Sequence, residues 1–313
     1  MVSIIIPVYN RAHLVGRTLQ SVAAQSLRPL EVVLIDNGST DGTLAVLQEF
    51  KREHECADLR VVVDVEPRRG ATKARNRGAR LSSGNWLLFF DSDDTMDPDM
   101  VECYLVAARR QGGTDLVAGR ADRVDLNGSK HEKPYYKTDL LANSIFHASL
   151  CPLQCCLISR GLCERAGWWN EVLPTWNDWE FSIRLLLQQP SIAFYDEAIK
   201  VHIFLQRESI TGVDFASKAG SWELAIDAVE QELINAGGVP CRERLLKYVE
   251  YRRVVLSGLY LGEGRKDLAA PLFGQVCNRL RRNVALRLLY SLLRYYIAAG
   301  GRGASHIVKA LVR

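Results

Sequence analysis

The sequence predicts an α/β protein with a mostly parallel sheet flanked by helices, followed by a helical C-terminal extension. Short apolar runs rich in Val, Ile and Leu alternate with helix-length amphipathic segments through the first half of the 313-residue chain. Strands that are apolar throughout are typical of a parallel sheet covered on both faces. Beyond about residue 215 only helical patterns occur. We therefore predict an α/β domain at residues 1–212 and a helical region at residues 213–313.

Each element is predicted from a local pattern. A short apolar run rich in β-branched residues predicts a strand, and a longer segment with apolar residues every three or four positions predicts a helix. The predicted strands are 2–8, 31–35, 60–65, 86–90 and 115–118, with one or two more over 192–204. The predicted helices are 12–25, 42–54, 71–81, 98–111, 160–166 and 178–188. The irregular, polar stretch 119–150 predicts a long loop.

The composition is typical of a globular protein and excludes several classes. The chain is 48% hydrophobic and 24% charged, with a formal net charge of +4, and nothing in it predicts a nucleic-acid partner. No apolar run approaches the roughly 20 residues of a spanning helix, and the N-terminal run resembles a strand rather than a signal peptide. The eight cysteines form no CxxC pair, although Cys151, Cys155 and Cys156 cluster. Idle thiols in a reducing cytosol are the expectation, which predicts a cytoplasmic protein.

Positive charge is concentrated near the C-terminal end. Residues 278–313 contain eight basic residues and no acidic one, namely Arg279, Arg281, Arg282, Arg287, Arg294, Arg302, Lys309 and Arg313. The apolar residues at helical spacing on one face are Leu286, Leu289, Leu293 and Ile297. This face either packs on the protein or another subunit, or lies peripherally on an anionic membrane at the inner face of the cell.

Polar residues follow three of the predicted strands. The first strand ends in Tyr9 and Asn10, the second in the stretch 36–39 (DNGS), and the fourth in the stretch 91–94 (DSDD). Each stretch alone is compatible with a solvated turn, since Asp and Asn favour turns. In open α/β sheets, however, ligands bind outside the carboxyl ends of the strands. We therefore expect the three stretches to meet in one ligand site.

The chemistry of that site points to phosphates held through a divalent cation. The chain has no GxGxxG and no GxxxxGK[ST] motif, which excludes the two common glycine-rich phosphate sites. Asp91 and Asp93 offer two carboxylates on one tight turn, and hard cations take oxygen ligands. Such a cation neutralises charge on a leaving diphosphate. The nearby basic residues either add to that neutralisation or form a solvated helix face; they are Arg68, Arg69, Lys73, Arg75 and Arg77.

Four blocks in fixed order carry a family resemblance: VSIIIPVYNR, VVLIDNGSTDGT, ATKARNRGARLSSGNWLLFFDSDD and WNDWEFSIRLL. They resemble the family 2 inverting glycosyltransferases with the GT-A fold, over about residues 2–210. The resemblance implies a nucleotide-sugar site lined by Pro7, Tyr9, Asn10, Asp36, Arg75, Asn76, Asp91 and Ser92. It implies a Mn²⁺ or Mg²⁺ cofactor held by Asp93, with Asp91 near the metal or the ribose and His202 as a third metal ligand or a diphosphate contact. It also implies Asp178 as general base and Trp176 and Trp179 as an acceptor platform.

The chain departs from the family pattern at two positions, and several site residues have structural alternatives. Asn37 stands where many members have a second carboxylate, and Asn177 where Glu is frequent. For Asp178 the alternative is a helix N-cap, and for His202 a structural histidine. For the two tryptophans the alternative is core packing. Tyr135 and Tyr136 are candidates for an acceptor loop.

The resemblance implies transfer of a sugar from a UDP- or dTDP-sugar to a hydroxyl group of a glycan or lipid-linked saccharide, as in cell-envelope polysaccharide synthesis. The acceptor attacks the anomeric carbon in a single inverting displacement, and Asp178 takes its proton. A sugar nucleotidyltransferase is the second enzymatic hypothesis, and it has no need of the Asp178 region. A non-catalytic nucleotide-sugar-binding subunit is the third, and it would bind donor without releasing a nucleoside diphosphate.

Overall fold

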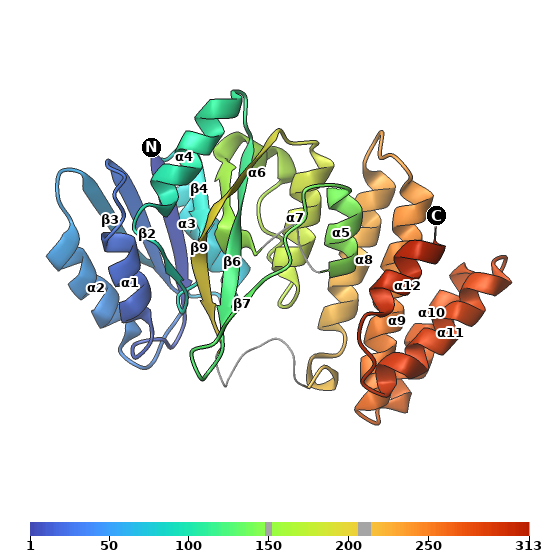
Figure 1. Cartoon of the computed structure of the whole chain (residues 1–313). Helices are drawn as coiled ribbons and strands as arrows, with labels where there is room; N and C mark the ends of the chain where they lie inside the picture. The colour runs from blue at the N-terminus through green and yellow to red at the C-terminus, as the bar shows by residue number, and fades with distance from the viewer. Residues whose placement is uncertain (148–151, 206–213, 313) are drawn as a thin grey trace. The chain divides into compact units, whose positions relative to one another are not determined.

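The computed structural model describes residues 1–147, 152–205 and 214–312, which divide into two compact units (Figure 1). The first unit comprises Met1–Thr138, Leu150–Pro174 and Gln188–Arg207. The second comprises Asp139–Ser149, Thr175–Leu187 and Glu208–Arg313. The predicted boundary between residues 212 and 213 lies outside the described residues. The second unit also includes two earlier segments that a single boundary does not anticipate.

The first unit is built on one sheet with the strand order β3-β2-β1-β4-β8-β6-β9-β5, and β7 pairs with β6. The strands are β1 (Val2–Val8), β2 (Leu30–Asp36), β3 (Leu59–Val65), β4 (Trp86–Phe89), β5 (Thr95–Met96), β6 (Leu116–Val124), β7 (Lys130–Glu132), β8 (Cys156–Ser159) and β9 (Ile192–Phe204). Strands β3, β2, β1 and β4 are parallel, as the apolar runs predict. In the other half only β6 and β9 are parallel, and the remaining pairs are antiparallel.

Helices cover both faces of this sheet (Figure 1). In the view of Figure 1, α1 (Val15–Ala23), α2 (Thr43–His54) and α4 (Met100–Gln111) lie in front of the sheet. Behind it lie α3 (Ala71–Leu81) and the shorter α6 (Arg160–Ala166). Gly78 lets α3 approach β1 closely, because a Cβ there would lie only 2.5 Å from Cγ2 of Ile5. The second half of α3 thus packs closely against β1.

The prediction of a long loop over residues 119–150 is wrong for much of that stretch. Strand β6 continues to Val124, β7 follows, and α5 spans Leu140–His147, while residues 148–150 lie outside the described residues. The polar residues of β6 disguise it as a loop. They are paired across the sheet, since Arg120 makes a bidentate ion pair with Glu132 of β7, at 2.8 and 2.7 Å. Strands β5 and β8 are also absent from the prediction, because their few residues carry too short a pattern.

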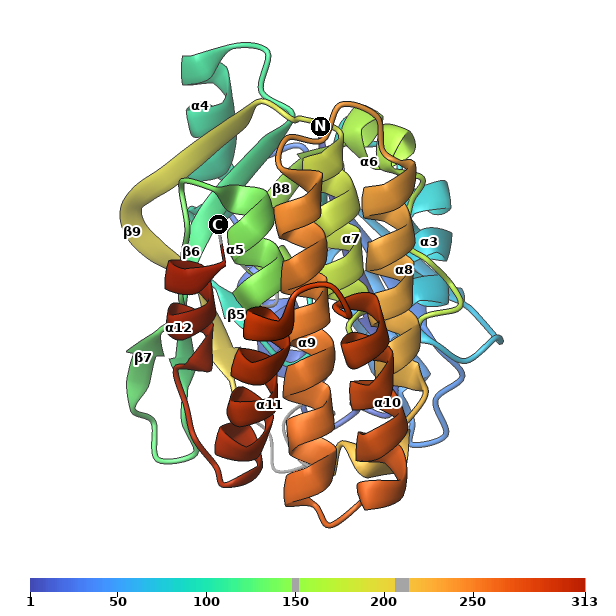
Figure 2. The same ribbon diagram turned by 90° about the vertical axis from the view of Figure 1, so that its right-hand side faces the viewer.

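The second unit is helical in its described residues, as predicted beyond residue 215. It contains α5, α7 (Asn177–Leu187), the 3₁₀ helix η2 (Ala216–Lys218), α8 (Ser221–Asn235), α9 (Arg242–Gly262), α10 (Lys266–Arg279), α11 (Val284–Ala298) and α12 (Ala304–Leu311). Helix α9 is central, and α5, α8, α10 and α11 pack against it (Figure 2). Its Arg253 is buried and pairs with Asp227 and Glu230, each at 2.6 Å, which supplies the partners that a buried cation requires. Among the described helices, none is both long and apolar enough to cross a bilayer.

Candidate active site

The loops after β1 and β2 are tied together by Asn10. Its backbone N–H donates to Oγ of Ser39 at 2.9 Å, and its Oδ1 accepts from the backbone N–H of Thr40 at 2.9 Å. Asn10 has a φ of 47°, a left-handed conformation that asparagine tolerates better than most residues. Pro7 lies within β1 opposite Ile35 of β2. The two loops thus meet at the carboxyl edge of the sheet, as predicted.

Tyr9 is partly exposed at this edge and is covered on one side by a cation. The guanidinium carbon of Arg69 lies 3.1 Å from the centroid of the Tyr9 ring. An arginine stacked on an aromatic ring is attracted by the ring's negative face. The same side chain is suited to an anion such as a diphosphate, because guanidinium groups bind phosphate oxygens in a fixed geometry.

Asp36 is buried and retains one carboxylate oxygen without a partner. Its Oδ2 accepts from the backbone N–H groups of Gly38, at 3.1 Å, and Ser39, at 3.0 Å. Its Oδ1 is buried and accepts no hydrogen bond from any residue that the structure describes. A buried acceptor left without a donor costs about 1–3 kcal/mol. A ligand N–H group at this oxygen would relieve that cost.

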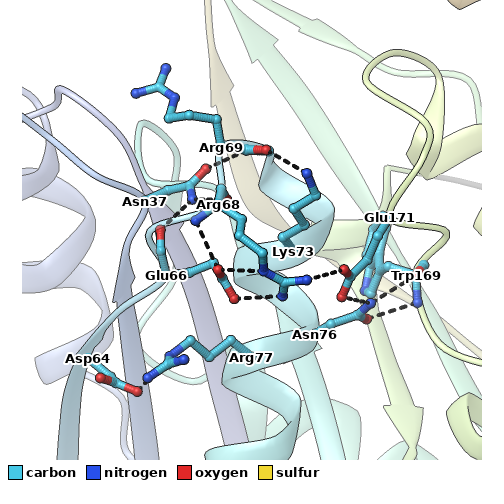
Figure 3. A network of polar contacts seen from close by, with 11 residues as sticks. Asn37, Asp64, Glu66, Arg68, Arg69, Lys73, Asn76, Arg77, Trp169 and Glu171 are labelled. Atoms are coloured by element: carbon cyan, nitrogen blue, oxygen red, sulfur yellow. Dashed lines mark hydrogen bonds and ion pairs between the residues drawn. The ribbon is translucent and has the colours of Figure 1, made fainter.

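The Asn37 side chain holds a neighbouring backbone segment in place (Figure 3). This structural role explains why the chain has an amide rather than a carboxylate at position 37. Its Nδ2 donates to the backbone carbonyls of Glu66 and Arg68, both at 2.9 Å. Its Oδ1 accepts from the backbone N–H of Gly70 at 2.8 Å. A carboxylate has no N–H group to donate, so it could not hold both carbonyls. Asn37 therefore fixes the path of residues 66–70, which lead into α3.

We expect Asn37→Asp to lower the free energy of unfolding by about 1–3 kcal/mol, because it places a buried carboxylate beside two carbonyls that lose their donors. The matched control is Asn127→Asp, since the exposed Asn127 side chain accepts a bond from Ser129 at 3.0 Å, which a carboxylate can also accept. Urea titration of both variants checks this expectation. Equal midpoints for the two variants would contradict the role given to Asn37.

An ion-pair network joins this segment to residues 169–171 (Figure 3). Arg68 binds the buried Glu66 through both carboxylate oxygens and also contacts Glu171 at 3.0 Å. The hydrogen bonds from Arg68 lower the pKa of Glu66 to about 2. Asn76 donates to the Trp169 carbonyl, at 2.9 Å, and to Glu171, at 3.1 Å, and accepts from the Trp169 N–H, at 3.0 Å. The structure therefore engages Asn76 in anchoring this loop, and its predicted contact with the donor stays a prediction.

The negative charge of the acidic turn after β4 is only partly balanced by nearby arginines. Nη2 of Arg75 binds Oδ1 of Asp91 at 2.9 Å, and its guanidinium lies 4.4 Å from the Trp169 ring centroid. Oδ2 of Asp93 lies 4.0 Å from Nε of Arg11. Burial, and then the charge of Asp91, raises the pKa of Asp93 in spite of Arg11 and Arg17. Ser92, which lies between the two aspartates in the sequence, is buried. The turn thus concentrates negative charge that a cation would balance.

Asp94, which we did not predict as a functional residue, anchors the turn from behind. Its Oδ1 accepts from the Phe204 N–H at 3.0 Å, and its Oδ2 accepts from Nε2 of Gln154 at 2.8 Å. It is almost fully buried, and burial raises the pKa of its carboxyl group well above the usual range. Thr18 of α1 donates to its carbonyl oxygen at 2.7 Å. The third aspartate of the DSDD stretch is therefore part of the support of the turn.

The two predicted metal-binding carboxylates fit a divalent cation whose coordination shell is completed by a bound ligand. Asp91 and Asp93 supply hard oxygen donors, which suit Mg²⁺ and Mn²⁺. In the described ranges no three His, Cys, Asp or Glu side chains are grouped as a metal site. Magnesium is commonly held by one or two carboxylates together with substrate phosphates. A cation here would depend on a diphosphate for its remaining ligands.

His202 lies on β9, opposite Thr95 of β5, and is held by two other carboxylates. Its Nδ1 is 2.8 Å from Oδ1 of Asp122, and its Nε2 is 3.2 Å from Oδ1 of Asp97. Both ring nitrogens thus have partners other than Asp91 and Asp93. The alternative of a structural histidine accounts for these contacts, and the role of His202 as a metal ligand stays a prediction.

Asp178 belongs to the second unit, in the first turn of α7. It lies inside the helix rather than at its cap, and its side chain is exposed. The helix dipole favours a negative charge there by about 0.3–1 kcal/mol. Asp178 also attracts Arg252 of α9, a buried guanidinium whose Nε and Nη2 have no hydrogen-bond partner among the described residues. Burial lowers the pKa of Arg252 to about 10, against the attraction of Tyr251 and Asp178.

The two predicted acceptor tryptophans differ in their surroundings. Trp179 is fully buried, and its indole N–H donates to the Ser144 carbonyl at 2.8 Å. Trp176 is half-buried, has a φ of 48°, and lies 4.9 Å from Trp222 between ring centroids. The Arg252 guanidinium lies 4.7 and 4.8 Å from the centroids of Trp176 and Trp179. Trp179 is therefore part of the core, as the structural alternative expects, and of the two tryptophans only Trp176 is partly exposed.

The motifs and their placement agree with the model of one protein family. The family model described as "Glycosyl transferase family 2" matches residues 3–166, which include Asp36 at the end of β2 and the turn after β4 that carries Asp91 and Asp93. The chain belongs to glycosyl transferase family 2. A relative from Mycobacterium bovis, named as a PGL/p-HBAD biosynthesis glycosyltransferase, is 31% identical over 185 residues, covering 59% of this chain and 69% of the relative. The chondroitin synthase of Escherichia coli is 32% identical over 149 residues, covering 46% of this chain and 21% of the synthase.

Several solved protein structures resemble this chain in fold, at low sequence identity. The S. aureus TarS 1–349 structure, in complex with UDP-GlcNAc, has a TM-score of 0.67 and 18% identity, and covers 99% of this chain and 91% of that one. The chain spans 55% of a longer TarS structure. The mannosyltransferase PcManGT of Pyrobaculum calidifontis, in complex with GDP-Man and Mn²⁺, has a TM-score of 0.59 and 18% identity, covering 98% and 86%. These likenesses support the predicted GT-A fold of the family 2 enzyme.

Proposed function

We propose that this family 2 enzyme transfers a sugar from a nucleoside-diphospho-sugar to a hydroxyl group of a glycan or lipid-linked saccharide, with inversion. Two features at one edge of the sheet carry the proposal. A buried Asp36 oxygen accepts no hydrogen bond from the described residues, and the negative charge of the Asp91–Asp93 turn is only partly balanced by nearby cations. The oxygen would accept from a base N–H, as the N3–H of uracil or thymine offers, and Asp91 and Asp93 would hold a divalent cation. UDP-sugars and dTDP-sugars are the proposed donors, as the family resemblance implies.

The basic residues at this edge have a binding role in the proposal. Arg69, stacked on Tyr9, and Arg11, near Asp93, provide positive charge for the diphosphate oxygens. Arg75 is already paired with Asp91, and it orients that carboxylate. Bound Mn²⁺ or Mg²⁺ supplies Lewis-acid stabilisation of the departing diphosphate. Asp91 and Asp93 would hold it.

Asp178 is the proposed general base. An exposed carboxylate can receive the hydroxyl proton of an acceptor that arrives from solvent. The carboxylate takes the proton as the acceptor oxygen bonds to the anomeric carbon, and the bond from that carbon to the diphosphate oxygen breaks. Base assistance of this kind contributes about 10²–10⁴-fold. Trp176 offers a ring face on which the acceptor sugar stacks.

The test is a calorimetric titration of the whole chain with UDP-, dTDP- and GDP-sugars, in Mn²⁺ and after chelation with EDTA. We expect one uridine or thymidine donor to bind in Mn²⁺, and both EDTA and Asp93→Ala to weaken that binding at least tenfold. Asp58→Ala is the control, because Asp58 is an exposed carboxylate just before β3, at the opposite end of the strand. Binding that is indifferent to Mn²⁺ and to Asp93 would overturn the metal site.

Product analysis then separates transfer from its alternatives. With donor and acceptor present, release of a nucleoside diphosphate with a new glycosidic bond of opposite anomeric configuration supports the proposal. Pyrophosphate-dependent turnover would identify a sugar nucleotidyltransferase instead. Donor binding with no release of nucleoside diphosphate for any acceptor would identify a non-catalytic subunit.

A further inference from the structure

Helix α11 carries an apolar surface on the side that faces away from the protein core. Val284, Leu288, Leu292 and Tyr295 recur at helical spacing, and they are 54%, 62%, 71% and 60% exposed. We call these four residues the outer face of α11. Seven of the sixteen exposed large apolar residues in the described ranges lie between residues 284 and 311. Exposed apolar residues are therefore concentrated in this part of the chain, and such patches mark interaction sites.

The apolar face that the sequence singles out is a different one. Leu286 and Leu293 are buried, together with Tyr290, whose hydroxyl donates to the Lys247 carbonyl of α9 at 2.7 Å. The packing is close because α9 has glycines where α11 crosses it. A Cβ on Gly258 would lie 2.9 Å from the Arg294 carbonyl oxygen, and one on Gly262 would lie 2.9 Å from that of Ala298. The predicted face thus packs on the protein, and this packing leaves the outer face of α11 exposed to solvent.

A helix with an outward face of this kind departs from the usual pattern. Helices on the surface of a globular protein place charged and polar residues opposite the buried stripe. Here the four residues of the outer face are apolar, and the charged side chains of α11, Arg287 and Arg294, are half-buried. Exposing two leucines of this size to water forgoes about 1.5–3 kcal/mol each relative to burial. Such a face is consistent with a binding partner.

The charge around the outer face selects that partner. Arg281 and Arg282 are exposed immediately before α11, and Arg302 is exposed after it. The segment 278–313 has eight basic residues and no acidic one. Two copies docked through this face would bring the two basic segments together, and like charges repel. An anionic surface gains from the same charge, by Coulomb attraction and by burying the leucines.

We propose that the outer face of α11 binds the surface of an anionic lipid bilayer. Apolar residues on one face with basic residues beside it are the composition of helices that lie in the membrane interface. Tyrosine is enriched at that depth, where its ring is apolar and its hydroxyl group stays hydrated, as Tyr295 would. Leu288 and Leu292 enter the boundary between headgroups and acyl chains, and Arg281 and Arg282 contact lipid phosphates. The contact is peripheral and reversible.

Vesicle flotation with the full chain tests this proposal. Phosphatidylcholine vesicles are compared with vesicles in which phosphatidylglycerol replaces a third of that lipid, at low and high salt. We expect binding to the anionic vesicles only, weakened by salt because exposed charges are screened. Leu288→Ser/Leu292→Ser is expected to lower the partition coefficient roughly tenfold or more, and Arg281→Ala/Arg282→Ala by a similar factor.

The control is Leu126→Ser, because Leu126 is 67% exposed on the loop between β6 and β7, far from α11 in sequence. It should bind vesicles like the wild type. The circular dichroism melts of all variants must match, so that reduced binding reports the surface. Absence of wild-type binding to anionic vesicles, or equal loss in Leu126→Ser, would overturn the proposal. A wild-type oligomer that Leu288→Ser/Leu292→Ser dissociates, with no vesicle binding, would show instead that copies of the chain cover this face.

Discussion

We expect Asp178→Asn to lower kcat by about 10²–10⁴-fold while donor affinity stays unchanged. The amide has nearly the shape of the carboxylate but cannot accept the acceptor's proton, so the loss falls on the chemical step. Asp178 lies in the second unit, whereas the residues proposed for the donor lie in the first. Steady-state kinetics with donor and acceptor, beside calorimetry with donor alone, measures the two effects separately.

The matched control for Asp178→Asn is Asp267→Asn. Asp267 is an exposed aspartate in the first turn of α10, so this change also removes a charge from the start of a helix. Its kcat should equal that of the wild type. If Asp178→Asn retains kcat within a factor of about three, the base is another residue. If it instead unfolds readily, the interaction with the buried Arg252 is the more important role of Asp178.

We expect Trp179→Ala to destabilise the second unit by about 3–5 kcal/mol. The change leaves a cavity, removes the donor to the Ser144 carbonyl, and takes away one of the two rings on which the Arg252 guanidinium stacks. A buried cation that loses its contacts adds to the cost of the cavity. Urea titration, followed by circular dichroism of this helical unit, measures the loss.

Trp176→Ala is the comparison that separates core from acceptor contact. Its ring is half-buried, so we expect a smaller loss of stability than for Trp179→Ala. The left-handed backbone conformation at residue 176, with a φ of 48°, should contribute no gain in stability, because alanine is no better suited to it than tryptophan. We expect the acceptor KM to rise in Trp176→Ala while the donor affinity is retained. Similar stability losses for the two variants would contradict the distinction drawn between them.

The sequence by itself predicts the parallel half of the sheet, because each of those strands is a short apolar run with a polar stretch at its carboxyl end. Strands β1 to β4 and helix α3 occur within a residue or two of their predicted bounds. The alternation of strand and helix also places Asn10, Asp36 and the acidic turn at one edge. Local pattern suffices here because the central strands β1 and β2 are almost entirely buried, so that most of their residues are apolar.

The tertiary structure alone decides the roles of residues whose partners are remote in sequence. Asn37 and Asn76 hold loops, since their amides donate to backbone carbonyls 29 to 93 residues away. The charged residues Arg120 and Asp122 make β6 resemble a loop in sequence, but Glu132 and His202 contact them across the sheet. Trp176 and Trp179 are three residues apart, yet only one is fully buried, and α11 buries one apolar face and exposes another. Burial and pairing depend on what the chain brings together in space, and no local pattern records that.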